Sequence, residues 1–203
     1  MTISYAITAC NEHVELDRLL DQLSKHIRPE DEIVIQLDTT ATDEVTSVVE
    51  KYHLVRYYFP LNNDFASFKN NLKQHCKGDF IFQIDADETI YEFMIEMLPQ
   101  ILEANPDLEC ASVPRINTVE GLTQEHINKW GWNVTANGWI NYPDFQMRIL
   151  KNKPEIKWVN KVHEKIVGYK THAYLPYDQE EWCLQHPKTI ERQERQNNFY
   201  NTI

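Results

Sequence analysis

The strongest structural signal in this chain is the run Phe80-Ile81-Phe82-Gln83-Ile84-Asp85-Ala86-Asp87-Glu88. Its apolar half is nearly continuous, which is typical of a strand buried on both faces of a parallel sheet. Because side chains two positions apart in an extended chain point to the same side, Asp85 and Asp87 are expected to converge where this strand ends. Two converging carboxylates suit a hard divalent cation, Mn²⁺ or Mg²⁺, that also binds phosphate oxygens. The alternative is an ordinary pair of loop acids.

Strand and helix patterns alternate before this run. The periodicity of apolar residues predicts strands at 3–8, 33–37 and 54–59 and helices at 16–26, 45–52 and 64–76. This alternation favours an α/β fold with a parallel sheet, in which ligands bind beyond the carboxyl ends of the strands. Three predicted strand ends are polar, namely those at Ala9-Cys10-Asn11-Glu12, at Asp38 with Asp43, and at Asp85 to Glu88.

The pattern changes after the acidic run. A helix at 91–104 is predicted despite Pro99, and a strand at 110–114 follows it. Residues 117–145 are rich in Asn, Trp and Gly without a clear period, which predicts a binding loop or an irregular cap. The last predicted elements are a hairpin of 145–150 with 156–159 and a polar helix over 189–200.

Composition excludes several classes of protein. The chain has 203 residues and a formal charge of −11, so a nucleic-acid partner is not expected. Its five glycines form no GxGxxG or GxxxxGK[ST] motif, so a bound nucleotide diphosphate would need a metal to neutralise it. Four scattered cysteines, no transmembrane run and no signal peptide predict a cytoplasmic protein, in the host cytoplasm if a phage encodes it.

Five motifs in this order resemble the family 2 glycosyltransferases. They are Thr8-Ala9-Cys10-Asn11-Glu12, residues 31–38 with Thr42-Asp43, Asp64-Phe65 with Lys69-Asn70, Asp85-Ala86-Asp87-Glu88, and residues 158–164. The last, Trp158 to His163-Glu164, is similar to a bacterial and phage branch that includes lipopolysaccharide-core sugar transferases. The resemblance implies a single GT-A domain over 1–203, with one Rossmann-like, mostly parallel sheet. It divides the domain into a nucleotide-sugar-binding half (1–115), a small irregular or β acceptor-side half (116–187) and a terminal helix (188–203).

The resemblance also implies roles for individual residues. The nucleotide-sugar donor would be bound by Thr8, Ala9, Asn11, Glu12, Asp38, Lys69, Asp85, Ala86 and Asp87. Lys69 stands where many members have arginine, and it lacks the two-pronged hydrogen bonding of a guanidinium. Asp87 is the expected direct metal ligand, and Asp85 is expected to hold the ribose or a metal-bound water. His163 or His186 would complete the metal site, although a lone histidine more often bonds a backbone carbonyl.

The implied reaction is inverting transfer of a sugar from a UDP-sugar to a hydroxyl of a glycan or glycoconjugate. UDP-glucose is the first candidate for the donor. The general base is Asp144 or Glu164, with a slight preference for Asp144, although Tyr142-Pro143-Asp144 replaces the Glu-Asp pair of many members. Trp132 and Trp139 either stack on a sugar or only pack. Two alternatives are a nucleotidyltransferase on a related fold and a non-catalytic protein that binds sugar nucleotides. The sequence does not indicate the oligomeric state.

Overall fold

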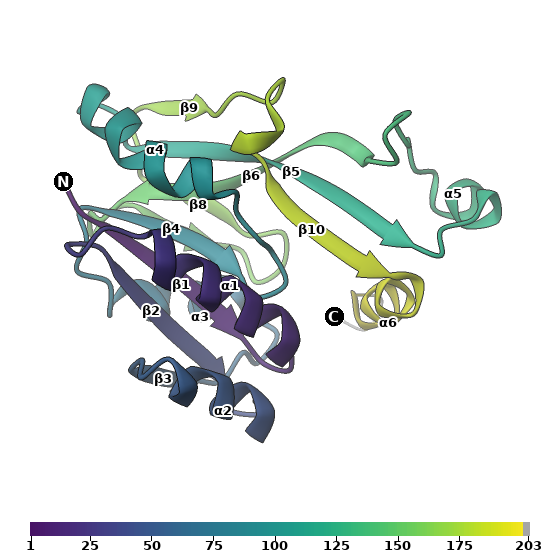
Figure 1. Cartoon of the computed structure of the whole chain (residues 1–203), viewed down its shortest axis with the longest axis horizontal. Helices are drawn as coiled ribbons and strands as arrows, with labels where there is room; N and C mark the ends of the chain where they lie inside the picture. The colour runs from purple at the N-terminus through teal and green to yellow at the C-terminus, as the bar shows by residue number, and fades with distance from the viewer. Residues whose placement is uncertain (201–203) are drawn as a thin grey trace.

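A computed structural model describes the backbone of residues 1–200 and the side chains of residues 1–198. Its main sheet has the strand order β10-β5-β6-β4-β1-β2-β3, and β9 also pairs with β5 (Figure 1). The strands are β1 (Ile3–Ala9), β2 (Glu32–Asp38), β3 (Arg56–Phe59), β4 (Phe80–Asp85), β5 (Cys110–Glu120), β6 (Ile140–Lys151), β9 (His172–Tyr174) and β10 (Leu184–Thr189). Five of the seven pairings in this sheet are parallel, so the mostly parallel α/β fold expected from the sequence is confirmed.

Helices and a small second sheet cover the two faces of the main sheet. They are α1 (His13–His26), α2 (Asp43–Lys51), α3 (Phe65–Lys73), α4 (Glu92–Ala104), the 3₁₀ helix η1 (Glu180–Trp182), and β7 (Lys157–Val159) paired with β8 (Lys165–Val167). Two further helices, α5 (Gln124–Trp130) and α6 (Ile190–Tyr200), lie beyond the end of the sheet. One apolar core joins α1, α2, α4 and η1 to the sheet, and the other joins α3, β7 and β8. Neighbouring β1 residues alternate between the cores, since Tyr5 belongs to the first and Ala6 to the second.

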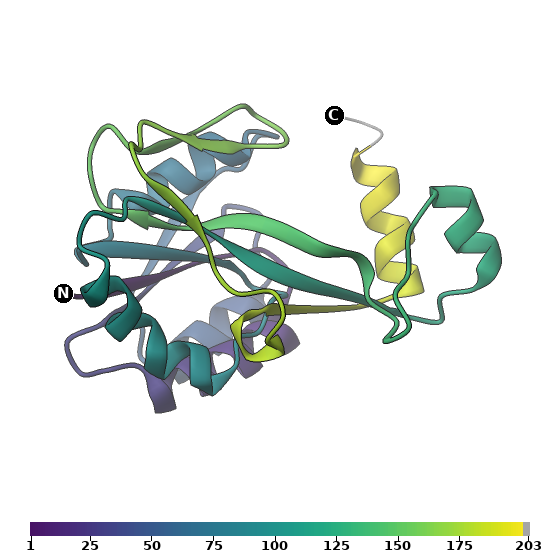
Figure 2. The same cartoon turned by 90° about the horizontal axis from the view of Figure 1, so that it is seen from above.

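The direction of the strands brings six carboxyl ends to one edge of the sheet. Strands β1, β2, β3 and β4 are parallel, β6 runs antiparallel to both β4 and β5, and β10 is parallel to β5. Consequently β1, β2, β3, β4, β5 and β10 all end at the same edge, and β6 begins there. Figures 1 and 2 show β5, β6 and β10 extending past the other strands at this edge, toward α5 and α6.

The prediction of an irregular segment over 117–145 is largely wrong. Strand β5 continues to Glu120, β6 begins at Ile140, and α5 lies between them. The helix is fixed at both ends, because Thr123 caps it together with His126 and Gly131 ends it in the left-handed conformation. The polar residues of the two strand extensions face a cleft instead of a core, so no apolar period marked them as strands.

The predicted hairpin of 145–150 with 156–159 is also wrong. Strand β6 is paired on one side with β4 and on the other with β5, so it has no free edge for β7. Strand β7 pairs with β8 instead and packs over α3. The terminal helix begins at Ile190, not at 188, because β10 continues to Thr189. Residues 201–203 of the predicted helix lie outside the described residues.

Candidate active site

A cleft of about 1510 Å³ lies at the edge where these six strands end. It is lined by every residue that the sequence predicted to bind the donor, namely Thr8, Ala9, Asn11, Glu12, Asp38, Lys69, Asp85, Ala86 and Asp87. His163, Glu164, His186 and Trp132 line it as well, whereas Asp144 and Trp139 do not. The structure therefore gathers residues from positions 8 to 186 of the chain around one cavity.

The charge of the cleft differs from that of the whole chain. Its lining has six acidic residues and the six basic residues Lys69, Arg115, Arg148, Lys188, Arg192 and Arg195. The whole chain has 31 acidic and 20 basic residues. The cleft lining is thus balanced in charge although the whole chain is acidic, so an anion is repelled less in the cleft than elsewhere on the surface.

Asp85 is held by cations at the end of β4. Its Oδ2 accepts a hydrogen bond from Nη2 of Arg148 at 2.5 Å, and its Oδ1 lies 3.9 Å from Nζ of Lys69. Burial raises the pKa of Asp85, but the charges of Arg148 and Lys69 outweigh it and hold this pKa well below its usual range. Arg148 also binds Oε1 of the buried Glu88 at 2.6 Å. Asp85 is therefore ionised and directed toward these cations.

Asp87 contacts a histidine from the other end of the chain. Nε2 of His186 lies 3.1 Å from Oδ2 of Asp87, and both side chains are largely buried. On the other side of the ring, Nδ1 of His186 lies 2.8 Å from Oδ1 of Asn117. These residues meet because β10 pairs with β5 in a register that sets His186 beside Asn117.

The hydrogen bonds of Asn117 determine which nitrogen of His186 carries a proton. Nδ2 of Asn117 donates to the carboxylate of Asp144 at 2.8 Å, so the Oδ1 atom of Asn117 must be the one that faces His186. A carbonyl oxygen only accepts, so Nδ1 of His186 is the protonated nitrogen. If Nε2 is unprotonated, it and the Asp87 carboxylate then direct electron pairs at the same point. Burial lowers the pKa of His186 more than Asp87 raises it, which favours this state.

Asp87 and His186 thus fit a divalent cation. A histidine ligand typically donates its second ring N–H to a carbonyl or carboxylate, as His186 does to Asn117. No group of three or more His, Cys, Asp or Glu side chains that could hold a metal is present among the described residues. A cation here would therefore need oxygens from the diphosphate or water as further ligands, as is common for Mg²⁺.

Arg192 reaches the same carboxylate from α6. Its Nη2 lies 3.2 Å from Oδ2 of Asp87, and its guanidinium also contacts Glu15 and Glu12 of the α1 region. A cation bound by Asp87 and His186 would compete with Arg192 for this oxygen. The guanidinium has two other carboxylates to bind when it leaves Asp87.

Asp38, at the end of β2, accepts hydrogen bonds from two loops. Its Oδ1 accepts hydrogen bonds from the backbone N–H and the hydroxyl of Thr40, and its Oδ2 accepts one from the N–H of Leu61. Burial raises the pKa of Asp38, but these hydrogen bonds outweigh it and lower the pKa overall. The ionised side chain therefore joins two loops that line the cleft.

The two predicted bases lie in different surroundings. Oε1 of Glu164 accepts a hydrogen bond at 2.5 Å from Nζ of Lys69, which also lies over the ring of Trp158. Asp144 stands directly opposite Arg115 in the β5–β6 ladder. Its Oδ2 accepts from Arg115 at 2.7 and 2.9 Å and from Asn117.

Gln146 completes the hydrogen bonds of Asp144 by donating to its Oδ1. Burial raises the pKa of Asp144, but the charge of Arg115 and the hydrogen bonds outweigh it, so the pKa is lowered overall. Because these bonds engage both oxygens and its pKa is low, Asp144 is a weak proton acceptor. Glu164 has one hydrogen-bond partner, Lys69, among the described side chains and lines the cleft.

The remaining predicted residues are also placed. His163 lies in the exposed loop between β7 and β8 with a positive φ of 53°, and it lines the cleft, but Asp87 contacts His186. Trp132 lines the cleft and packs against Trp130, with ring centroids 4.6 Å apart. Trp139 packs edge to face on Tyr142 instead.

Four polar residues that line the cleft were not singled out from the sequence: Arg115, Asn117, Lys188 and Arg192. A signal for three of them was present, because Arg115 and Asn117 alternate on β5 and Lys188 follows His186 by two positions on β10. Alternate positions of a strand share a face, so each polar pair indicates the face of its strand that lines the cleft. The pattern is hard to recognise in the sequence alone, because no apolar period marks residues 115–120 or 184–189 as strands.

Comparison with known proteins agrees with this fold and identifies the family. The model of the family described as Glycosyl transferase family 2 matches residues 4–162. The chain belongs to this family, and its domain is a glycosyltransferase domain with the GT-A fold. A curated relative is the lipopolysaccharide core biosynthesis glycosyltransferase LpsC of Rhizobium meliloti (strain 1021), which is 27% identical over 112 residues, 53% of this chain and 40% of LpsC.

Two solved structures share the fold. TarS 1–349 of S. aureus in complex with UDP-GlcNAc has a TM-score of 0.59 and 17% identity, over 93% of this chain and 59% of that one. Glucosyl-3-phosphoglycerate synthase of Mycobacterium tuberculosis with Mg²⁺ and UDP has a TM-score of 0.52 and 14% identity, over 74% and 56%. The chain spans less than two thirds of the length of each of these proteins. Among the described residues, no helix has the length and apolar character needed to cross a membrane.

Proposed function

We propose that this chain transfers a sugar from a UDP-sugar to a hydroxyl of a glycan or glycoconjugate, with inversion at the anomeric carbon and with Mn²⁺ or Mg²⁺ bound. The observation that carries this proposal is the pairing of Asp87 with His186 inside a cleft lined by basic residues, in a chain of this family. Related proteins bound to UDP-GlcNAc, or to UDP with Mg²⁺, support the donor class and the metal. UDP-glucose remains our first candidate donor.

The residues of the cleft divide the work of binding. Asp87 and His186 would hold the divalent cation, which when bound neutralises charge on the leaving diphosphate. Lys69, 3.9 Å from Asp85, and Lys188, whose charge lowers the pKa of Asp87, also line the cleft and would contact the diphosphate. The loops that Asp38 joins would position the nucleoside, by analogy with the resemblance described above.

We propose Glu164 as the general base and Asp144 as the residue that holds Arg115 and Asn117 in place. The sequence favours Asp144, but Glu164 lines the cleft and Asp144 does not. In an inverting transfer the acceptor oxygen attacks the anomeric carbon as its bond to the diphosphate breaks. The base then accepts the proton of the acceptor hydroxyl, so it needs a carboxylate oxygen within reach of the cleft.

The roles of these two carboxylates can be separated by amide variants. We expect Glu164→Gln to lower kcat by about 10²- to 10⁴-fold, because an amide cannot take the proton. Asp144→Asn is expected to act mainly on metal affinity, because it disturbs Asn117. The measurement is UDP release with water as acceptor, as a function of donor concentration and pH. A large loss of kcat in Asp144→Asn with little loss in Glu164→Gln would assign the base to Asp144.

The orientation of His186 is expected to control metal affinity. Asn117→Ala removes the acceptor that holds Nδ1–H of His186, so the affinity for Mn²⁺ in the presence of UDP should fall about 10- to 100-fold. Free Mn²⁺ measured by electron paramagnetic resonance gives this affinity directly. Asn105→Ala, which removes an exposed amide at the end of α4, serves as the control. Equal affinities in the two variants would contradict the role of Asn117.

The proposal as a whole is tested by nucleotide release from UDP-, GDP-, dTDP- and CMP-sugars with Mn²⁺, Mg²⁺ or EDTA. Metal-dependent release of UDP from one or two donors supports it and identifies the sugar. Release of pyrophosphate from a nucleoside triphosphate and a sugar phosphate would favour a nucleotidyltransferase. Tight donor binding without turnover would favour a binding protein. We also propose a cytoplasmic location, since all four cysteines are free thiols.

A further inference from the structure

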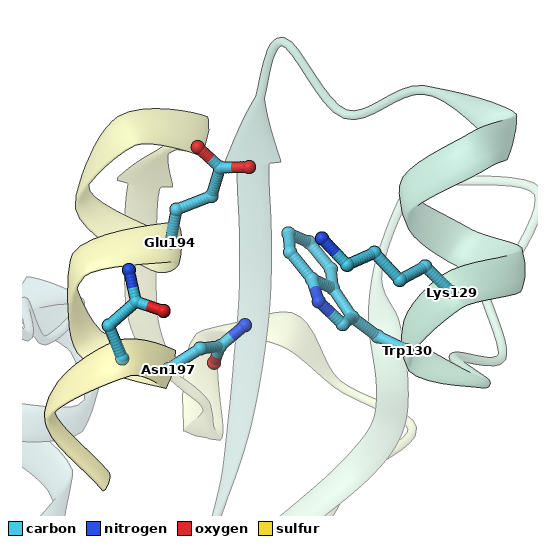
Figure 3. A pocket seen from close by; sticks show the side chains of 5 residues that line it. Lys129, Trp130, Glu194 and Asn197 are labelled. Atoms are coloured by element: carbon cyan, nitrogen blue, oxygen red, sulfur yellow. The ribbon is translucent and has the colours of Figure 1, made fainter. Parts of the chain in front are cut away.

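A second, smaller cavity lies between α5 and α6, beside the main cleft (Figure 3). Its volume is about 260 Å³, and it is lined by Lys129, Trp130, Glu194, Asn197 and Asn198. Asn197 also lines the main cleft, so the two cavities meet along α6. None of the predicted donor-binding residues lines the smaller cavity.

An indole ring forms the apolar wall of this cavity. In Figure 3 the ring of Trp130 reaches from α5 toward Glu194 and Asn197 of α6. The ring is fixed from behind, because it stacks on His126 with centroids 5.2 Å apart and packs on Trp132 at 4.6 Å. Trp132 itself lines the main cleft, so apolar surface continues from one cavity into the other. An indole held in this way offers packing surface to the C–H groups of a sugar ring without losing side-chain freedom on binding.

The other wall of the cavity is polar and nearly neutral. The helix α6 carries the amides of Gln193, Gln196, Asn197 and Asn198, of which the first three line the main cleft and the last two the smaller cavity. Each amide both donates and accepts hydrogen bonds, as neighbouring sugar hydroxyls require. Lys129 and Glu194 contribute opposite charges, so the cavity has no excess charge for a phosphorylated or acidic sugar.

The position of the cavity indicates which substrate it serves. The predicted donor-binding residues come from the ends of β1, β2 and β4, whereas α5 and α6 adjoin the ends of β5 and β10. Figures 1 and 2 show both helices beyond the carboxyl ends of β5 and β10, away from β2 and β3. A ligand in the smaller cavity would therefore extend from the acceptor side of the main cleft.

We propose, on the basis of the glycosyltransferase function above, that the cavity between α5 and α6 binds a neutral pyranose of the acceptor glycan next to the sugar that is modified. The protein would then recognise at least two sugar units of the acceptor. Trp130 packs on the ring of this pyranose, and Asn197 and Asn198 bond its hydroxyls. This site would distinguish glycan acceptors from small hydroxyl compounds, because only a glycan fills both cavities.

Saturation-transfer NMR with maltose, cellobiose, lactose and N,N′-diacetylchitobiose tests the proposal without turnover. We expect at least one of these disaccharides to bind at millimolar concentration, and glucose 6-phosphate to bind less. Trp130→Ala should lower the affinity for the disaccharide by about tenfold. Trp130→Phe should retain most of this affinity because it keeps an aromatic ring. Tyr58→Ala, which removes an exposed aromatic ring from β3, is the matched control and should bind as the wild type does.

Two results would overturn this proposal: no binding of any of the four disaccharides, or equal binding by the wild type and by Trp130→Ala. UDP release from the donor by the wild-type chain is measured in parallel without saccharide. If donor turnover is absent while Trp130-dependent disaccharide binding remains, the proposed transferase function fails and the saccharide site stands. If turnover is present and binding is absent, the saccharide site fails alone.

Discussion

Asp87→Asn is expected to release UDP from its donor at least about 10²- to 10³-fold more slowly than the wild type, at saturating donor and Mn²⁺. The substitution keeps the shape of the side chain but removes the charge that would bind the cation beside His186. Electrostatic stabilisation of a leaving group by a metal contributes several kcal/mol, and each factor of ten in rate corresponds to about 1.4 kcal/mol. Most of the loss should therefore appear in kcat.

The charge of Asp87 is present across the neutral pH range. Burial raises its pKa, but a hydrogen bond from Nε2 of His186, when that atom is protonated, and the charge of Lys188 outweigh burial and hold the pKa at about 2. A bound cation would take the place of the Nε2 proton and likewise favour the ionised carboxylate. The matched control is Asp107→Asn, which makes the same change of charge at an exposed position before β5. Mn²⁺ binding measured on both variants separates loss of the cation from loss of chemistry. Wild-type rates in Asp87→Asn would show that this carboxylate does not bind a required cation.

The parallel part of the fold was predictable from the sequence because burial on both faces leaves a direct mark. In the segment 80–88, an apolar run ends abruptly in carboxylates, which identifies both a central strand and its functional end. The same reasoning located the ends of β1 and β2. All nine predicted donor-binding residues come from these three strand ends and from α3, and all nine line the cleft.

The part of the site formed by β5, β6 and β10 was less predictable, because its side chains are placed by pairing between distant strands. His186 lies beside Asn117 only through the register of β10 with β5, and Arg115 faces Asp144 only through the antiparallel register of β5 with β6. No spacing along the chain encodes these registers. For the same reason the sequence slightly favoured His163, which adjoins Glu164, over His186 as the metal ligand, whereas the structure brings His186 to Asp87.

The buried ion cluster beneath the cleft leads to the largest expected effect on stability. Arg148 is 3% exposed, and its Nη2 contacts both Asp85 and the fully buried Glu88. Arg115 also contacts Glu88, so Arg148→Met leaves Glu88 one cationic partner and removes the nearest cation from Asp85. Removing one member of a buried ion pair typically destabilises a protein by about 3–5 kcal/mol, because a desolvated charge is left without compensation.

We therefore expect Arg148→Met to lower the free energy of unfolding, measured with urea at neutral pH, by about 3–5 kcal/mol. Arg56→Met, which breaks a surface pair with Glu50, is the matched control and should change this free energy far less, because water screens an exposed pair. The difference from the wild type should also shrink below about pH 4, the usual pKa of aspartate. The sign follows from the lowered pKa of Asp85: a carboxyl whose pKa falls on folding adds stability above its unfolded pKa and loses that contribution as the pH falls toward its folded pKa. An Arg148→Met variant as stable as Arg56→Met would mean that the cluster contributes nothing to the fold beyond the volume of its side chains.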